Sequence, residues 1–295
     1  MRETIAFIAD GKILESKNAV LPIYSITKTM IASIVLDLNI DLENVISRWI
    51  PRTICPHSDI VKIRHLMNHS SGIRDYGNLP EYINDVENRK LAWSDEKFIT
   101  TTVNRELLFS PGTNFAYSNP GYWLLKKIIE TESNLSFDEL IKKYIVLPLG
   151  LSSLKVAHGV FDNSLNGYVA EWVWHGLVMA DATDVALFMA SDKVARLNSS
   201  LNKVNYKDKY WQNPYYGLGL MVEPGDKYGH LGGGPGYEAA CIYFLESQII
   251  ACAIFSNDKK INPLEYLFAQ KDILRRKTST AQHSVQRTAG TRRGL

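Results

Sequence analysis

Residues 25–38 read SITKTMIASIVLDL, and we predict a buried helix that begins at Ser25, because the apolar residues recur at helical spacing. The tetrad Ser25-Ile26-Thr27-Lys28 has the pattern S-x-x-K and puts a hydroxyl and an amine one helical turn apart. A serine at a helix N-terminus faces unpaired backbone N–H groups, which stabilise negative charge on its oxygen. A lysine among apolar residues is desolvated, so its pKa falls and the neutral amine can act as a base.

The tetrad alone has little specificity. The chain contains five S-x-x-K sequences, which start at Ser25, Ser94, Ser152, Ser200 and Ser256. Only the first of them opens a long apolar helix. The alternative interpretation is a serine that caps the helix and an exposed lysine in its first turn. Further motifs are needed to choose between the two.

Tyr117-Ser118-Asn119 lies in a turn-rich loop, residues 109–121, that leads into a predicted helix. Two other Y-x-N triplets, at Tyr76 and Tyr82, lack this setting. Loops on rigid scaffolds often carry catalytic groups. A tyrosine beside a lysine ammonium is expected to have a lowered pKa and to relay protons. The alternative is a tyrosine and an asparagine that close the loop by hydrogen bonds.

A glycine-rich segment, His230-Leu231-Gly232-Gly233-Gly234-Pro235-Gly236, precedes a predicted strand and contains the only H-x-G sequence of the chain. Consecutive glycines let a substrate lie close to the backbone. A backbone N–H in such a segment can help to form an oxyanion hole. The alternative interpretation of this segment is a flexible glycine turn.

Signatures of several other kinds of site are missing from the sequence. There is no G-x-S-x-G nucleophile elbow, no P-loop and no full G-x-G-x-x-G. His65 and His69 stand four residues apart, but the segment between them lacks the glutamate of a zincin helix. The three cysteines are widely spaced and form no C-x-x-C pair. We therefore expect no metal and no cofactor.

The order of the predicted elements indicates an α/β (α+β) fold. We predict a hairpin over residues 4–15, mainly helices over about 47–205, and a β-meander from residues 216–222, 239–245 and 249–256. The helices with the clearest periodicity are 121–131, 137–144 and 183–195, and a last helix runs from 263 to about 276. Strands at both ends imply one antiparallel sheet, flanked by helices and assembled from the two termini.

This pattern divides the chain into three parts. Residues 1–46 and 205–276 form the predicted sheet domain, and residues 47–204 form a mostly helical insert. Residues 277–295 hold basic but no acidic residues and read as a disordered tail or an expression remnant.

Composition and charge limit the partners and the location. The formal net charge is +2, from 33 basic and 31 acidic residues, which gives no electrostatic reason to expect nucleic acid. The longest apolar run, about residues 30–36, is far too short to span a membrane. The N-terminus lacks the apolar region of a signal peptide, so we expect a cytoplasmic location for the chain as it stands. A periplasmic or extracellular location is expected if an export signal has been removed. Nothing in the sequence indicates an oligomeric state.

Taken in order, the motifs resemble those of the serine β-lactamase and penicillin-binding-protein-like superfamily. The branch that they resemble most contains class C β-lactamases, D-alanyl-D-alanine carboxypeptidases and family VIII esterases. Framework segments extend the resemblance over about residues 3–270; these are 65–73, 109–125, 147–152, 176–184, 216–220 and 230–237. The resemblance implies an antiparallel sheet flanked by helices, with the active site between the sheet and a helical domain.

The resemblance implies a role for each motif. Ser25 would be the nucleophile and Lys28 its base partner. Tyr117 would be the general acid or base that also activates the deacylating water. Asn119 would orient the substrate amide and Lys28. The backbone N–H groups of Ser25 and Gly233 would form the oxyanion hole.

The strand motif departs from the family pattern at two positions. His230-Leu231-Gly232 takes the place of K-T-G, and His230 is a replacement that the family's peptidases and esterases tolerate. Leu231 replaces a threonine or serine whose hydroxyl helps to hold a substrate carboxylate. An alternative register, Lys227-Tyr228-Gly229, would restore a K-x-G. His230 is expected to belong to the catalytic residues. The residues expected to contact substrate are Leu231, Gly232, Trp172 and Trp174, with core packing as the alternative for the two tryptophans.

We therefore predict a serine hydrolase that cleaves ester or amide bonds of small substrates through a Ser25 acyl-enzyme. The missing hydroxyl at Leu231 favours an esterase or a D-amino-acid amidase. The alternatives are a β-lactamase or D-alanyl-D-alanine carboxypeptidase, and a catalytically silent penicillin-binding-like module. The intact set of Ser25, Lys28 and Tyr117 argues against the silent module. The expected partner is a small-molecule ester, amide or β-lactam, with no nucleic acid and no membrane span.

Overall fold

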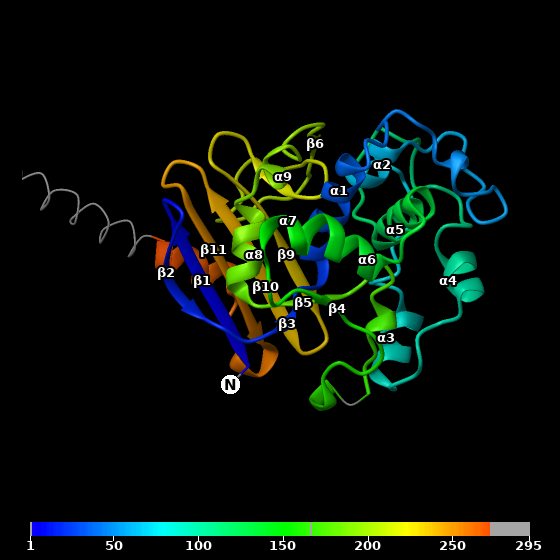
Figure 1. The fold of residues 1–295 in the computed structure, drawn as a ribbon. Coiled ribbons are helices and arrows are strands. Elements are labelled where there is room, and N and C mark those ends of the chain that lie inside the picture. Colours follow the sequence, from blue (N-terminus) through cyan, green and yellow to red (C-terminus); the bar gives the residue numbers. More distant parts are fainter. Residues whose placement is uncertain (1, 166, 272–295) are drawn as a thin grey trace, which may run out of the picture.

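The computed structural model describes residues 2–165 and 167–271. The predicted tail, 277–295, and the end of the predicted last helix lie outside these residues. Figure 1 shows a large sheet with helices packed against it, and a second group of helices beside the sheet. The prediction of an α/β fold with an antiparallel sheet is confirmed.

The sheet has eight antiparallel strands in the order β2-β1-β11-β10-β9-β8-β7-β6. They are β1 (Glu3–Ala9), β2 (Lys12–Lys17), β6 (Asn202–Lys203), β7 (Tyr215–Tyr216), β8 (Met221–Glu223), β9 (Lys227–Gly234), β10 (Tyr237–Phe244) and β11 (Ile249–Ser256). Ala6 of β1 lies opposite Cys252 of β11. The N-terminal hairpin therefore joins the C-terminal meander, as predicted from the strands at both ends.

Most of the helices lie between β2 and β6 in the sequence. They are α1 (Thr27–Asp37), α2 (Ile63–Met67), α3 (Pro80–Glu87), α4 (Asp95–Thr101), α5 (Asn119–Ser133), α6 (Phe137–Ile141), α7 (Leu147–Leu149), α8 (Ala182–Met189) and α9 (Asp192–Ala195). A π-helical turn, Lys142–Val146, joins α6 to α7, and a last helix covers residues 263–271.

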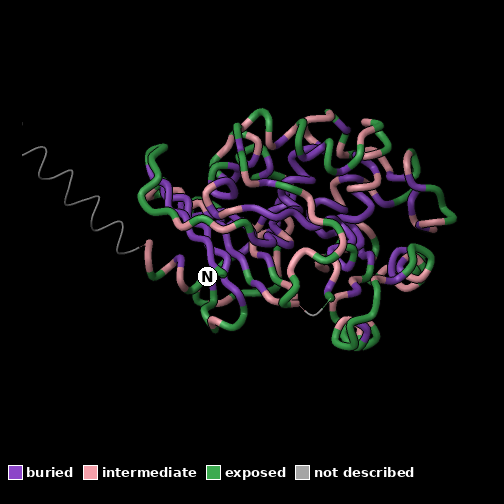
Figure 2. Tube along the Cα trace, turned by 60° about the horizontal axis from the view of Figure 1, so that its bottom comes forward, coloured by how far each residue is buried: buried purple, intermediate pink, exposed green. Residues whose placement is uncertain are grey.

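Side chains alternate between the two faces of the sheet along each strand, and a core cluster covers each face. Ala6 and Ile8 of β1 belong to the main core, which also contains residues of α1 and α8. Ile5 and Phe7 belong to a second cluster on the other face, together with Leu267 of the last helix. Figure 2 shows the central strands as buried along most of their length. Strand β9, which lies between β10 and β8, therefore belongs to a sheet that is covered on both faces.

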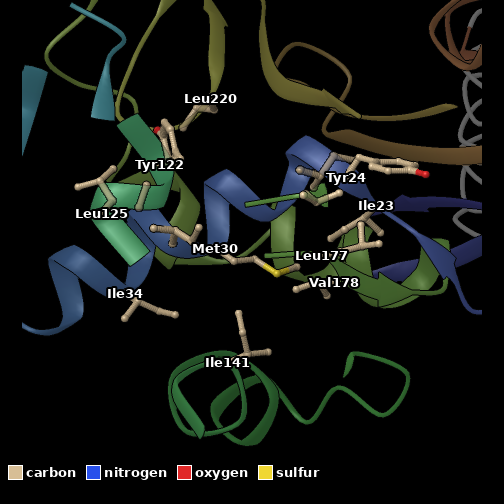
Figure 3. Close-up of a cluster of buried hydrophobic side chains, with 14 of the residues drawn as sticks. Ile23, Tyr24, Met30, Ile34, Tyr122, Leu125, Ile141, Leu177, Val178 and Leu220 are labelled. Atoms are coloured by element: carbon tan, nitrogen blue, oxygen red, sulfur yellow. The ribbon is translucent and has the colours of Figure 1, made fainter. Parts of the chain in front are cut away.

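Helix α1 runs through the main core, and every residue from Thr27 to Val35 is buried. A helix that is apolar on all sides is expected to be enclosed in this way. Figure 3 shows Met30 and Ile34 in one cluster with Leu125 of α5 and Ile141 of α6. The helix that follows Ser25 is thus held from several sides.

A small sheet of β3 (Leu21–Pro22), β5 (Val178–Ala180) and β4 (Lys155–Val156) fixes the chain just before α1. Leu21 lies opposite Ala180, and the Ile23 N–H donates to the Val178 carbonyl at 3.0 Å. This pairing brings the residues that precede β5 next to the start of α1.

Some predicted bounds were wrong. The helix begins at Thr27, and Ser25 lies in the preceding 3-10 turn, Tyr24–Ile26. Residues 216–222 do not form one strand: β7 ends at Tyr216 and β8 begins at Met221, because the chain turns at Gly219 with a φ of +84° against Ala32. Residues 183–195 form two helices, α8 and α9, because the backbone of Ser191 is extended between them.

Candidate active site

Ser25 and Lys28 lie side by side at the start of α1. The Lys28 Nζ atom is 2.8 Å from Ser25 Oγ. Lys28 is fully buried, so the interpretation as an exposed first-turn lysine is wrong. This burial lowers the pKa of Lys28 well below its usual value, and the carboxylate of Asp75 opposes the shift. A neutral amine beside a serine hydroxyl is in position to act as a base.

Asn119 brings the second motif to the same lysine. Its Oδ1 atom accepts a hydrogen bond from Lys28 Nζ at 2.7 Å. Asp75 accepts from the Asn119 backbone N–H at 2.7 Å and from its Nδ2 at 3.3 Å. Ser118 caps α5 by accepting from the Gly121 N–H, which fixes the start of the helix. Because Asp75 takes the amide hydrogen, the oxygen of Asn119 faces Lys28.

Tyr117 stands over the same two side chains. Tyr117 and Ser25 line a common cavity, and the Lys28 Nζ atom lies 5.1 Å from the centre of the Tyr117 ring. The ring packs on His69 at a centroid distance of 4.2 Å. Burial raises the pKa of Tyr117 above its usual value, because a phenolate would lose its hydration. The predicted lowering of this pKa was therefore wrong, and Tyr117 is a neutral hydroxyl.

Residues 230–234 of the glycine-rich segment belong to strand β9, and only Pro235 and Gly236 form a turn. The strand runs along the 3-10 turn that holds Ser25. A Cβ atom on Gly232 would lie 2.2 Å from the Ile23 carbonyl oxygen, and one on Gly234 would lie 2.3 Å from the Tyr24 ring. These glycines are required because two backbones approach each other closely. Gly233 faces open space beside Ser25.

His230 lies on the strand within the same site but makes its own hydrogen bonds. Its Nδ1 atom donates to the Leu231 carbonyl at 2.5 Å, and Nε2 accepts from the Tyr216 hydroxyl at 2.7 Å. Burial lowers the pKa of His230 to about 3, so the ring is neutral. In the alternative register, Lys227 would take the place of His230. Lys227 lines neither cavity that contains Ser25, and its ammonium binds Glu223 at 3.0 Å, near Trp211.

Two cavities meet at Ser25 and Gly233. The first, of about 450 Å³, is lined mainly by apolar and aromatic side chains, including Phe115, Met221 and Leu231. The second, of about 360 Å³, lies between α3 and the strand and includes Tyr82. A carbonyl bound at Ser25 can therefore place one substituent in each cavity, as an acyl-transfer site requires.

Each cavity has one acidic side chain among the described residues that line it. In the first cavity this side chain is Glu238, and in the second it is Glu87. Of the described residues that line the first cavity, only His230 could carry a positive charge, and its ring is neutral. A substrate therefore meets carboxylates on both sides of Ser25 and no arginine or lysine in either lining.

The two predicted tryptophans lie in different places. Trp172 lines the second cavity, where it also packs on Tyr82 and donates its indole N–H to the Lys90 carbonyl. Trp174 lines neither cavity that contains Ser25, and its ring stacks on Phe98 at 4.0 Å. The structure thus does not bring Trp174 to the site, because the chain turns it into the helical core.

Sequence reasoning missed two residues that contact the proposed machinery. His175 Nε2 lies 3.2 Å from Lys28 Nζ, and Asp75 binds Asn119. Neither residue belongs to a local motif. His175 is 147 residues from Lys28 in the sequence, and Asp75 is 44 residues from Asn119. The pairing of β3 with β5 brings His175 to the site, and no sequence signal marked it.

Two observations concern metal binding and membrane-spanning helices. Within residues 2–165 and 167–271, no group of three or more His, Cys, Asp or Glu side chains is arranged to hold a metal ion. None of the helices in that part of the chain is long and apolar enough to cross a bilayer.

Comparison with known proteins extends these observations. Penicillin-binding protein 4* of Bacillus subtilis is 25% identical over 244 residues, which are 70% of this chain and 53% of that protein. The D-aminopeptidase of Gluconobacter oxydans is 30% identical over 138 residues, 43% of this chain and 24% of that protein. The chain thus spans about half the length of the first relative and a quarter of the second.

A solved structure shares the fold. The D-amino acid amidase from Ochrobactrum anthropi SV3, complexed with L-phenylalanine, superposes with a TM-score of 0.69 over 86% of this chain and 85% of that one, at 20% identity. The profile of the beta-lactamase family matches residues 6–271. Because this match covers the sheet, α1 and the three motifs together, the chain belongs to the beta-lactamase family.

Proposed function

We propose that the protein is a serine hydrolase that forms an acyl-enzyme at Ser25 and prefers substrates without a carboxylate. The observation that carries the proposal is the buried Lys28 amine, 2.8 Å from Ser25 Oγ and held by Asn119. A lysine desolvated in this way is poised to take a proton near neutral pH.

Acylation follows from this geometry. The Lys28 amine takes the Ser25 proton as Oγ attacks the substrate carbonyl, and the carbonyl oxygen becomes an oxyanion. The backbone N–H groups of Ser25 and Gly233 are the proposed donors to that oxyanion. Tyr117 donates its proton to the leaving alcohol or amine and regains one from Lys28 as the tetrahedral intermediate collapses.

Deacylation repeats these steps with water in place of Ser25. Tyr117 takes a proton from the water as the water oxygen attacks the ester carbonyl, and passes its own hydroxyl proton to Lys28. The second collapse returns that proton to Ser25 and releases a carboxylic acid. The neutral hydroxyl of Tyr117 suits a relay that passes one proton on as it accepts another.

The acidic side chains that line the two cavities support a preference for some of the substrates that family members cleave. Glu238 and Glu87 would repel a substrate carboxylate and attract an ammonium group. We propose neutral esters and amino-acid amides or esters with a free amine as substrates, with an inclination to D-amino acids. The Gluconobacter D-aminopeptidase and the Ochrobactrum D-amino acid amidase support that inclination.

Covalent labelling tests the proposal. The wild type and Ser25→Ala are incubated with a fluorophosphonate and with a fluorescent penicillin, and the intact mass is measured. We expect wild type to take up the fluorophosphonate well and the penicillin slowly, and Ser25→Ala to take up neither. Rapid labelling by penicillin would favour a β-lactamase or carboxypeptidase. A folded wild type that takes no label would favour a silent module and contradict the proposal.

A further inference from the structure

We infer that His175 is a positioning residue that turns the lone pair of the Lys28 amine toward Ser25. This inference rests on the proposed function, in which Lys28 takes the Ser25 proton. His175 lies just before β5, outside the three motifs, and its side chain is buried.

Three polar atoms surround the Lys28 nitrogen: Ser25 Oγ at 2.8 Å, Asn119 Oδ1 at 2.7 Å and His175 Nε2 at 3.2 Å. The bond from Asn119 to Asp75 fixes the Asn119 oxygen toward the lysine, so this atom can only accept. The role of His175 depends on which of its ring nitrogens carries the proton.

The ring of His175 is neutral. Burial lowers its pKa well below the usual value, and the charge of Lys28 acts in the same direction. Nδ1 has no hydrogen-bond partner among the described residues, and Nε2 faces Lys28 Nζ at 3.2 Å. The Lys28 nitrogen carries N–H groups whether it is neutral or charged, so it can donate to Nε2 in both states. Nε2 therefore carries the free lone pair and accepts from Lys28. The opposite tautomer would point an N–H at the ammonium that forms when Lys28 takes a proton.

A neutral amine has two N–H donors and one lone pair. In this site the acceptors Asn119 Oδ1 and His175 Nε2 take the two N–H groups. The lone pair is then left for the third neighbour, the Ser25 hydroxyl, which is the direction needed for proton transfer. Without His175, the amine can donate to Asn119 and Ser25, and its lone pair turns away from the proton that it should take.

The backbone keeps His175 in this place. Val178 accepts from the Ile23 N–H, and Figure 3 shows Leu177 and Val178 beside Ile23 in the main core. Gly176 follows His175 with a φ of +94°, and a Cβ there would lie 2.5 Å from the Phe137 ring. The turn that carries the histidine is thus fixed on both sides.

The test compares His175→Phe, which removes the acceptor, with His175→Gln, whose side-chain oxygen can replace it. The second-order rate constant of fluorophosphonate labelling is measured against pH for both variants and wild type. We expect His175→Phe to lower the plateau about 10- to 100-fold, a part of the full value of a general base. His175→Gln should restore most of that loss. The acidic limb of His175→Phe should move to lower pH, because its Lys28 ammonium has lost an acceptor.

Controls separate this role from a structural one. His158→Phe makes the same change at an exposed histidine bound to Asp138 and should leave the profile unchanged. Thermal unfolding shows whether each variant folds, and His175→Leu replaces His175→Phe if the latter does not. Two outcomes would overturn the inference but not the proposed function. One is unchanged labelling by His175→Phe, and the other is an equal loss of labelling rate in the Phe and Gln variants without a pH shift. A folded wild type without label would overturn the proposed function and the inference together.

Discussion

The Tyr24 hydroxyl donates a hydrogen bond to the backbone carbonyl of Pro235 at 2.5 Å. This bond ties the residue just before Ser25 to the end of strand β9. Tyr24 has a φ of +45°, a left-handed conformation that costs roughly 1–2 kcal/mol for a residue with a side chain. The hydrogen bond and the packing of its ring on Gly234 offset this cost. The turn with Ser25 and the strand with Gly233 are therefore fixed relative to each other.

Tyr24→Gly should destabilise the protein although it removes the strained conformation. The substitution regains about 1 kcal/mol of backbone strain but loses a buried aromatic ring, which costs about 3–5 kcal/mol. We expect a lower melting temperature in thermal unfolding. Tyr24→Phe is the matched control, since it keeps the ring and loses only the hydroxyl, at a cost of about 0.5–1.5 kcal/mol. A Tyr24→Gly protein more stable than wild type would show that the strain is not balanced by these contacts.

Tyr117→Phe should abolish the proton relay and keep the packing on His69. We expect turnover to fall on the order of 100- to 10,000-fold, the usual contribution of a general acid or base. The measurement is kcat for a neutral ester over a range of pH values, with thermal unfolding as a check on the fold. If the variant turns over at near-normal rates at every pH, Tyr117 only closes its loop.

The sequence predicted those elements and motifs whose residues are close together in the chain. The hairpin and the strands β10 and β11 followed from short runs of β-branched and aromatic residues bounded by turn signals, with β11 at the predicted bounds. The three motifs were recognised by their order and framework, and the structure places Ser25, Lys28, Tyr117 and Asn119 within one site. Their catalytic roles stay predictions.

Long-range contacts were outside the reach of sequence patterns. His175 reaches Lys28 only because β3 pairs with β5, and Asp75 reaches Asn119 across 44 residues. The direction of the Tyr117 pKa was predicted wrongly, because a neighbouring lysine was weighed and burial was not. Trp172 and Trp174 are two residues apart, yet only Trp172 lines a cavity with Ser25.

Buried neutral histidines should make the protein sensitive to acid. Burial lowers the pKa of His230 to about 3, from a usual value near 6.5 in the unfolded chain. Below about pH 6.5, His230 binds a proton in the unfolded chain but not in the folded protein. The free energy of unfolding therefore falls by about 1.4 kcal/mol per pH unit for this residue as the pH drops toward 3.

His230→Gln isolates this contribution, because a glutamine oxygen can still accept from Tyr216 and does not titrate. The free energy of unfolding of both proteins is measured with urea. We expect the difference between wild type and variant to narrow or to change sign as the pH falls from about 7.5 to about 5. His69 and His175, whose pKa values burial also lowers, stay in both proteins and cancel in the comparison. A difference in the free energy of unfolding that is independent of pH would mean that His230 is charged in the folded protein.

Leu231→Thr should change the preference between substrates with and without a carboxylate. Leu231 lines the first cavity, so the strand offers a carboxylate no hydroxyl there, and Glu238 in the same cavity repels it. A hydrogen bond to a charged group is worth roughly 1.5–3 kcal/mol, or about one to two powers of ten in acylation. The variant should therefore gain kcat/KM for nitrocefin, which bears a carboxylate, and keep or slightly lose kcat/KM for p-nitrophenyl acetate.

The comparison of the two substrates separates a specific effect from a general one. A change of the same size in kcat/KM for both would mean that Leu231 shapes the cavity without selecting for charge. Glu238→Gln provides a second, independent route to the same preference, because it removes the repulsion and adds no donor at the position of Leu231. If the two changes act separately, the double variant should gain on nitrocefin by about the product of the single gains. A wild type that already hydrolyses nitrocefin faster than neutral esters would contradict the proposed substrate class, because the leucine and the glutamate would then not exclude the carboxylate.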